Sequence, residues 1–215
     1  MTTHEDMQQL VDSGVIAVLR GVDEADVEQV AEALIEGGVT TLEVTADTPG
    51  AIDMIGDLAA AYEDREDVLI GAGTVLDAET ARSALLAGAE FVVCPSFHED
   101  VVETCNRYGA VVAPGVATPT EAIEAYETGA DLVKLFPASD LGASYLGSIK
   151  GPLGQIPIVP TGGIGPDNAG EFIEAGACAV GAGGSLIDDE AIEAGEYDVL
   201  TENAEALVAA VEDAR

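Results

Sequence analysis

The amino-acid sequence predicts an α/β fold: a (β/α)8 TIM barrel with an N-terminal helix, formed as a single domain by residues 1–215. Eight short apolar runs rich in Val, Ile and Leu recur along the chain, and their starts lie 20 to 28 residues apart. The hydrophobicity within each run is continuous rather than alternating, which is typical of parallel strands covered on both faces. A doubly wound open sheet is the alternative. It is less favoured because no GxGxxG fingerprint follows the first run.

The elements follow in a regular order. Residues 3–13 predict the additional helix, and the strands are then expected at VIAVLR from 15, TTLEVT from 40, VLIGAGTV from 68, FVVCP from 91, VVAPGV from 111, LVKLFP from 132, PIVPTGG from 157 and ACAVGAGG from 177. Helical patterns separate these runs. Several of them end at a glycine that leads directly into the next strand, as in EGGVTTLEV and ETGADLV, which indicates a helix C-cap and a short αβ loop.

The chain is strongly acidic, with 41 Asp and Glu against 7 Lys and Arg and a net charge of -34. Such a charge repels phosphate backbones and anionic lipids, so we expect neither nucleic acid nor membrane partners. Mean hydropathy of +0.26 argues against disorder, and the carboxylates fall on the polar faces of amphipathic helices. Self-repulsion of this size predicts a protein that requires salt, with a composition like that of halophiles. A calcium-binding or polycation-binding role is the alternative, but no DxDxDG loop supports it.

Cysteine usage and the N-terminus favour a cytoplasmic protein. Cys94, Cys105 and Cys178 are odd in number and widely spaced, so neither a disulfide framework nor a CxxC motif is present. No apolar run approaches the roughly 20 residues that span a bilayer, and MTTHEDMQQL resembles no signal peptide.

Lys134 is the first candidate catalytic residue. The chain has only two lysines, and Lys134 stands inside the otherwise apolar strand LVKLFP. Burial lowers the pKa of an amine and leaves more of the free base that can attack a carbonyl to form a Schiff base. Glu43, inside TTLEVT, is the matching buried acid and could relay protons through a water molecule. The structural alternative is an ion pair between the two in the barrel core.

Other strand ends supply candidate binding groups. Arg20 ends the first strand and suits a carboxylate, although an exposed loop arginine is the alternative. Thr74 could bind a substrate oxygen, whereas Pro95 and Phe136 could line the pocket or simply pack in the core.

Two glycine-rich strand ends, TGGIGPDN and GAGGS, precede helical patterns and could direct backbone N–H groups at an anion. Barrels commonly bind phosphate at the loops after these two strands. The candidates are Thr161, Gly162, Gly163, Gly184 and Ser185; tight turns without a ligand are the alternative.

The remaining titratable residues carry less information. Lys150 could lie at the rim near the phosphate or be an ordinary surface lysine. His98 is expected at a helix N-terminus and His4 in solvent. Neither histidine, nor Cys94, has metal-ligand spacing, so no metal is expected.

Taken in order, the segments GVIAVLRG, EGGVTTLEVT, IGAGTV, GAEFVVCPS, APGVATPTE, VKLFPA, KGP, PTGGI and VGAGGSL resemble the family of 2-keto-3-deoxy-6-phosphogluconate (KDPG) and 4-hydroxy-2-oxoglutarate aldolases. The resemblance runs from residue 14 to residue 186, and VKLFP with LEVT and PTGGI is specific. It implies a class I aldolase of the Entner–Doudoroff type without a cofactor, in which Lys134 carries the pyruvate Schiff base and Glu43 moves protons. It also implies a homotrimer.

Carried over to this sequence, the resemblance assigns the pyruvate carboxylate to Arg20 and Thr74, the pocket wall to Phe136 and Pro95, and the phosphate to Gly162, Gly163, Gly184 and Ser185. One position departs from it. Some members have an arginine shortly after LEVT, where this chain has Asp47, so Arg20 must serve alone. The configuration of the substrate at C4, gluconate or galactonate series, stays open.

Three rivals remain at this point. They are an aldolase for the galactonate epimer or for unphosphorylated 4-hydroxy-2-oxoglutarate, a non-catalytic barrel that binds phosphate ligands, and an imine-free enzyme of the phosphosugar isomerase or thiamine phosphate synthase type.

Overall fold

The computed structural model describes residues 3–215 and confirms the closed barrel. The strands are β1 (Val15–Leu19), β2 (Thr41–Thr45), β3 (Leu69–Gly73), β4 (Phe91–Val93), β5 (Val111–Ala113), β6 (Gly115–Val116), β7 (Val133–Leu135), β8 (Ile158–Pro160) and β9 (Val180–Ala182). All pairs are parallel, in the orders β5-β4-β3-β2-β1-β9 and β6-β7-β8.

Two features close these sheets into one barrel. β5 and β6 are a single barrel strand interrupted at Pro114, whose carbonyl still accepts from the Lys134 N–H at 2.9 Å. On the other side, a parallel bridge joins Thr161 after β8 to Gly181 in β9. The nine segments therefore form the eight strands that the sequence predicts.

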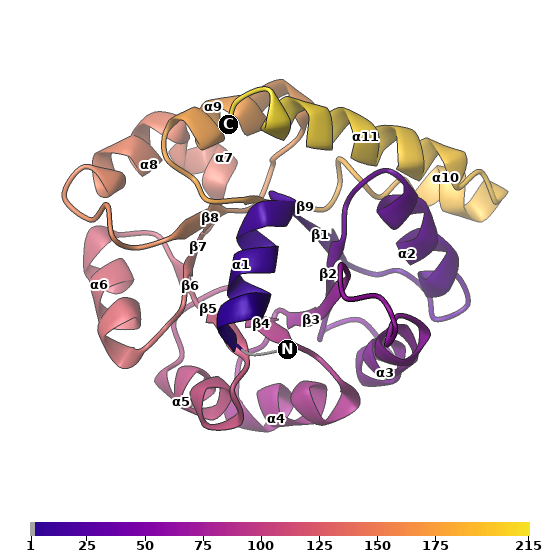
Figure 1. The fold of residues 1–215 in the computed structure, drawn as a ribbon, viewed down its shortest axis with the longest axis horizontal. Helices are drawn as coiled ribbons and strands as arrows, with labels where there is room; N and C mark the ends of the chain where they lie inside the picture. Colours follow the sequence, from indigo (N-terminus) through magenta and orange to yellow (C-terminus); the bar gives the residue numbers. More distant parts are fainter. Residues whose placement is uncertain (1–2) are drawn as a thin grey trace.

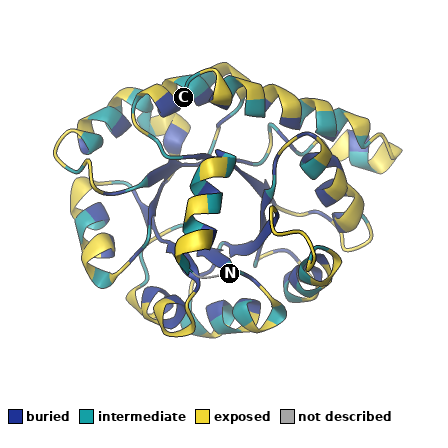
Figure 2. Ribbon diagram, viewed as in Figure 1, coloured by how far each residue is buried: buried dark blue, intermediate teal, exposed yellow. Residues whose placement is uncertain are grey.

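The helices surround this barrel (Figure 1). Their bounds are α1 (Thr3–Ser13), α2 (Val27–Glu36), α3 (Ala51–Ala61), α4 (Ala78–Ala87), α5 (Glu99–Tyr108), α6 (Pro119–Thr128), α7 (Ala138–Leu141), α8 (Ala143–Lys150), α9 (Pro166–Glu174), α10 (Asp189–Ala194) and α11 (Asp198–Glu212). The faces they turn outward are exposed and the strands are buried (Figure 2). Over residues 3–215, no helix has the length and hydropathy needed to cross a membrane.

Helix α1 confirms the predicted N-terminal helix and lies across one end of the barrel (Figure 1). Its Leu10 belongs to the cluster that fills the barrel interior, together with Ile16, Leu69, Phe91 and Leu132. The Thr3 hydroxyl donates to the Gly109 carbonyl at 2.7 Å and holds the start of the helix. With this end covered, the C-terminal ends of the strands are left to form a site.

Candidate active site

Lys134 lies in the middle of β7, paired in register with Gly115 and Val159. Leu132 packs in the barrel interior, so the side chain of Lys134, two residues later, turns to the same interior. Lys134 is only 5% exposed. Its Nζ lies 5.3 Å from the centre of the Phe136 ring, and within residues 3–215 it forms neither a hydrogen bond nor an ion pair. The strand therefore holds, at the edge of the core, an amine that is not engaged in a hydrogen bond or ion pair with residues 3–215.

Glu43 occupies the equivalent depth on β2, in register with Val18 and Gly71. It is 2% exposed, and its Oε1 is buried and has no hydrogen-bond partner in the described part of the chain. Burial raises the pKa of Glu43, against the opposing charges of Lys134 and Arg20. The structural alternative, a direct ion pair, is not found: among residues 3–215, no Lys134 nitrogen lies within 4.0 Å of a Glu43 carboxylate oxygen.

Gly73 at the end of β3 makes room for this carboxyl group. A Cβ atom at position 73 would lie 1.8 Å from Glu43 Oε1, a distance that no side chain can accommodate. Gly73, the second glycine of IGAGTV, is therefore required because any side chain at this position would collide with the Glu43 carboxyl group.

Arg20, just after β1, joins two neighbouring strand ends. Its Nη1 forms an ion pair with Asp47 and its Nη2 donates to the Thr74 hydroxyl at 2.7 Å. Thr74 has a φ of 55°, which is uncommon for a residue with a branched Cβ. Burial acts to raise the pKa of Asp47, but hydrogen bonding from Thr45 and the charge of Arg20 outweigh it and hold that pKa below its ordinary value. The sequence marked Asp47 as a departure, but not as the partner of Arg20.

A cavity of about 530 Å³ opens beside these groups. Seven of the predicted site residues and their neighbours line it: Val18, Arg20, Lys134, Phe136, Thr161, Gly162, Gly163, Gly183, Gly184, Ile187 and Asp189. The sequence analysis missed Val18, Gly183, Ile187 and Asp189. Val18 could have been found from strand alternation, since it lies two residues before Arg20.

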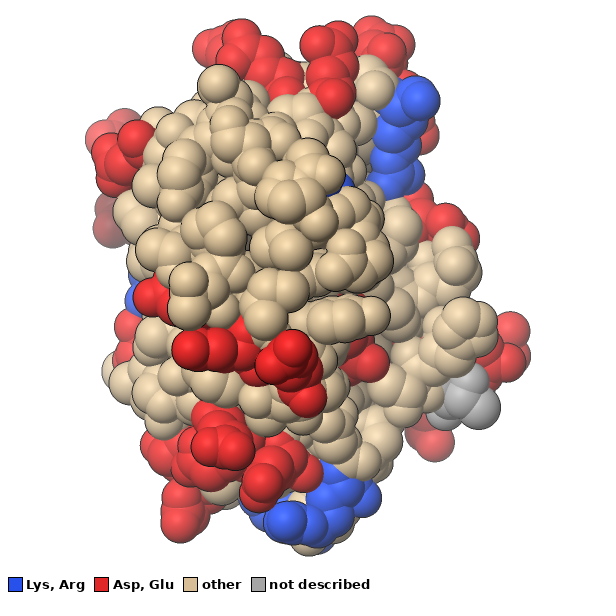
Figure 3. Space-filling model, turned by 90° about the vertical axis from the view of Figure 1, so that its left-hand side faces the viewer, with Lys and Arg blue, Asp and Glu red and all other residues tan. Residues whose placement is uncertain are grey.

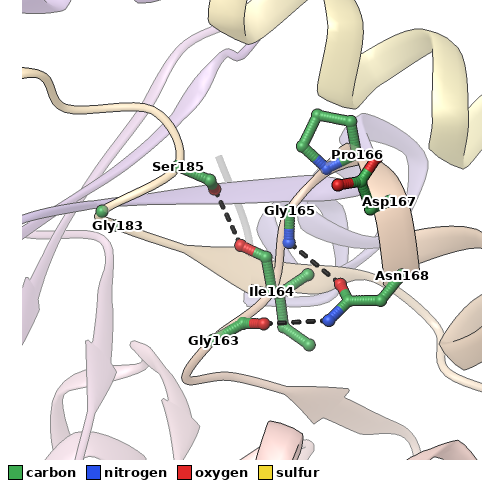
Figure 4. A pocket seen from close by; sticks show the side chains of 9 residues that line it. Gly163, Ile164, Gly165, Pro166, Asp167, Asn168, Gly183 and Ser185 are labelled. Carbon is green, nitrogen blue, oxygen red and sulfur yellow. Dashed lines mark hydrogen bonds between the residues drawn. The ribbon is translucent and has the colours of Figure 1, made fainter.

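An adjoining cavity of about 450 Å³ shares Gly163, Gly183 and Gly184 with the first and extends to the N-terminus of α9 (Figure 4). The Ser185 hydroxyl donates to the Ile164 carbonyl at 2.7 Å. Asn168 fixes the loop because its Oδ1 accepts from the Gly165 N–H at 3.0 Å and its Nδ2 donates to the Gly163 carbonyl at 2.9 Å (Figure 4). Backbone amides at a helix N-terminus are suited to an anion.

Three predicted residues lie outside the lining of both cavities. Glu43 lies on β2 and interacts electrostatically with Lys134. Thr74 is connected to the cavity through its hydrogen bond with Arg20, which lines it. Pro95 packs instead against the break between β5 and β6, where a Cβ atom at Gly115 would lie 2.2 Å from the Pro95 carbonyl carbon.

The other candidate residues lie apart from the site. Lys150 Nζ donates to the carbonyls of Gly154 and Ile156 at 3.1 and 2.8 Å, in the loop that enters β8. Of the two alternatives for Lys150, the place at the phosphate rim is therefore not the one found. His98 precedes α5, as predicted. Burial raises the pKa of the Cys94 thiol to about 12, which leaves it unreactive.

The family model described as "KDPG and KHG aldolase" matches residues 7–203. The chain belongs to this family. It is therefore an aldolase, a carbon–carbon lyase, as the resemblance implied.

Curated relatives include the 2-dehydro-3-deoxy-phosphogluconate aldolase of Treponema pallidum, 38% identical with 82% of this chain and 83% of the relative covered. The 2-dehydro-3-deoxy-6-phosphogalactonate aldolase of Escherichia coli is 35% identical, with 80% and 83% covered.

Among solved structures, the KDPG aldolase of Legionella pneumophila superposes with a TM-score of 0.86 at 32% identity, covering 94% of this chain and 97% of that one. It holds pyruvate captured at low pH as a covalent carbinolamine intermediate. A cage designed by fusing symmetric oligomeric domains also contains this fold, with a TM-score of 0.86 at 33% identity over 94% of this chain and 73% of the cage chain.

Proposed function

We propose that the chain reversibly cleaves 2-keto-3-deoxy-6-phosphogluconate to pyruvate and glyceraldehyde 3-phosphate through a Schiff base on Lys134. The observation that carries this proposal is the buried amine of Lys134 at the wall of the 530 Å³ cavity, with the buried carboxyl group of Glu43 interacting electrostatically with it. The carbinolamine that the Legionella relative forms with pyruvate supports the same chemistry here.

The reaction balances with these two groups. The Lys134 amine adds to the C2 carbonyl, and loss of water from the carbinolamine gives a protonated imine. As the C4 hydroxyl gives up its proton, the C3–C4 bond breaks and its electron pair moves into the imine, which yields glyceraldehyde 3-phosphate and an enamine. Protonation at C3 and hydrolysis then release pyruvate and the free lysine.

Glu43 is suited to move the protons of these steps. Burial raises the pKa of Glu43 above its ordinary value, which makes the carboxyl group a better proton donor and acceptor in catalysis than an exposed glutamate. Its Oε1 has no hydrogen-bond partner among residues 3–215, so it can bind a substrate atom or a water molecule that reaches it.

The two ends of the substrate are assigned to two groups of residues that line the cavity. Arg20, with Thr74 beside it, would bind the carboxylate through charge-assisted hydrogen bonds. The phosphate would bind the loops of Gly162, Gly163, Gly184 and Ser185, next to the α9 N-terminus.

Kinetics with three substrates tests the proposal. We expect kcat/KM for 2-keto-3-deoxy-6-phosphogluconate, followed by coupled pyruvate reduction, to exceed those for its C4 epimer and for 4-hydroxy-2-oxoglutarate. The epimer is a specific rival because a galactonate-series relative is 35% identical. A higher value for either rival would reassign the substrate, and no turnover of any of the three would favour a non-catalytic binding barrel.

The assembly and setting belong to the same proposal: a homotrimer in a cytoplasm of high salt. The relationship to a domain of a symmetric cage supports an oligomer. Light scattering in high salt should give three times the chain mass of 21.8 kDa, and a monomer mass would contradict it.

A further inference from the structure

Two of the seven basic residues of this chain have no polar partner in the structure. The five others line the active-site cavity, pair with a carboxylate or donate to backbone carbonyls: Arg20, Arg65, Lys134, Lys150 and Arg215. Arg82 and Arg107 form neither a hydrogen bond nor an ion pair among residues 3–215. In a protein with 41 acidic residues, two such arginines need a separate explanation.

These two arginines line the same groove, which lies between α4 and α5 and has a volume of about 420 Å³. Arg82 belongs to α4 and Arg107 to α5. Figure 3 shows basic side chains gathered at the lower end of the molecule, where Figure 1 places these two helices. The groove shares no residue with the cavity at Lys134 or with the adjoining cavity at α9. It is therefore a basic site separate from the candidate active site.

Tyr108 holds one of the two guanidinium groups in place. Arg82 Cζ lies 4.0 Å from the centre of the Tyr108 ring, which is a cation–π contact between α4 and α5. This contact orients Arg82 without using its N–H groups. The planar fork of donors thus stays free for the oxygen atoms of an anion.

Thr104, one turn before Tyr108 on α5, lines the groove with a hydroxyl group that lacks a partner. The residue is 5% exposed, and its hydroxyl forms no hydrogen bond within residues 3–215. Other helical hydroxyls of this chain donate to the carbonyl four residues earlier, as those of Ser83 and Thr128 do at 2.8 Å. The Thr104 hydroxyl is instead available to a ligand.

The charges of the groove favour a doubly charged anion. Glu79 on α4 is the carboxylate among the lining residues, and within residues 3–215 it forms no ion pair with either arginine. At 1 M salt the Debye length is about 3 Å, so a bound anion interacts with these local charges more than with the net charge of -34. A carboxylate would neutralise one guanidinium group, whereas a phosphate group carries roughly -1.5 to -2 and offers three acceptor oxygens.

We propose that the groove between α4 and α5 binds the phosphate group of a small molecule, with Arg82, Arg107 and Thr104 as its side-chain donors. This site is additional to the phosphate loops of the proposed aldolase reaction and does not depend on them.

Modification by phenylglyoxal, which reacts with accessible guanidinium groups, tests the site at each arginine. The protein is treated at constant high ionic strength with increasing inorganic phosphate or glycerol 3-phosphate in place of KCl, and peptide mass mapping gives each rate. We expect phosphate to slow the reaction of Arg82 and Arg107 at least about threefold. Arg65, which lies outside the groove, is the internal control and should be unaffected. A lower half-protecting concentration for glycerol 3-phosphate would assign the site to a phosphorylated metabolite, and equal values to inorganic phosphate.

Two variants separate a specific site from general charge screening. Thr104→Val removes the hydroxyl and should raise the half-protecting phosphate concentration at least about threefold. Glu79→Gln removes the opposing carboxylate and should lower it about twofold. Glu171→Gln makes the same charge change at an exposed position on α9 and should leave it unchanged. Aldolase activity checks the folding of each variant.

Protection of Arg20 alone, with Arg82 and Arg107 reacting as they do without phosphate, would show that phosphate binds at the active site but not in the groove, and would overturn the proposal. Equal effects of Glu79→Gln and Glu171→Gln, together with no effect of Thr104→Val, would also overturn it, because the protection would then come from charge screening.

Discussion

Lys134 and Glu43 are single residues whose burial makes them suited to catalysis. Both are charged residue types placed at inward positions of strands, and neither forms a hydrogen bond or an ion pair through its charged group within residues 3–215. Leaving a buried polar group unsatisfied costs about 1–3 kcal/mol. The unsatisfied Glu43 carboxyl group therefore lowers the stability of the fold, which is the pattern expected of a functional residue.

Replacing Glu43 should separate catalysis from stability. In Glu43→Gln we expect kcat to fall about 10² to 10⁴-fold, because proton transfer is lost. The pKa of Glu43 in the folded state lies above its ordinary value of 4.5, so the stability of the wild type declines as pH rises from 4.5 through the raised pKa. The stability of Glu43→Gln should not show this decline, because glutamine does not ionise.

Chemical unfolding across pH in constant high salt measures the difference. Glu43→Gln should be more stable than wild type near neutral pH, and the gap should close below pH 4.5. A gap that is independent of pH would show that Glu43 is not held with a raised pKa.

Gly73 should be intolerant of any side chain. A Cβ there would collide with Glu43 Oε1, so Gly73→Ala should lower kcat at least about tenfold and destabilise the fold by about 1–3 kcal/mol through overpacking. Steady-state kinetics and unfolding check both effects. Gly195→Ala, at a helix end with no atom within 4 Å of the added carbon, is the control for kcat. Equal kcat in the two variants would contradict the steric account.

At the scale of elements, the sequence predicts most of what the structure contains. Apolar runs and glycine C-caps locate all eight barrel strands and the N-terminal helix, because burial on both faces demands continuous hydrophobicity. Two divisions were not predicted: that of the fifth strand at Pro114, and that of the helical segment after the sixth strand into α7 and α8 at Gly142. The first depends on a tertiary contact, the close approach of Gly115 to Pro95.

The candidate site was likewise predicted in part from the sequence. Lys134, Glu43 and the glycine-rich ends could be predicted because C-terminal strand ends meet in a barrel. The Arg20–Asp47 pair, the position of Pro95 and the loop contacts of Lys150 could not, since they depend on side-chain directions across different strands.

Helix α6 offers a test of local stabilisation. The Thr118 hydroxyl accepts from the Glu121 N–H, and the Glu121 carboxylate accepts from the Thr118 N–H, which makes a capping box. Thr118→Ala should lower the free energy of unfolding by about 1 kcal/mol. Thr120→Ala, exposed two residues later, is the matched control and should change it little. Denaturant unfolding that shows equal losses would exclude the cap as the cause.

For the whole molecule, charge sets the working conditions. Among residues 3–215, Arg20–Asp47 and Arg65–Asp67 are the ion pairs in which arginine meets a carboxylate, so 41 acids are left largely to repel one another. Salt shortens the range of this repulsion to roughly 3 Å at 1 M.

The unfolding temperature should therefore rise by several degrees between about 0.1 and 2 M KCl. Calorimetry measures it, with sucrose at equal osmolality as the control for solvent exclusion. An equal rise in sucrose, or no rise in KCl, would show that charge repulsion does not limit stability.

The central claim is that Lys134 forms the imine. Borohydride reduction with pyruvate in high salt, followed by peptide mass mapping, tests it most directly, with Lys134→Met as the matched control. We predict one reduced adduct on Lys134 in the wild type and none in the variant. A folded, active wild type that traps no adduct, or one that carries it on Lys150, would contradict the account.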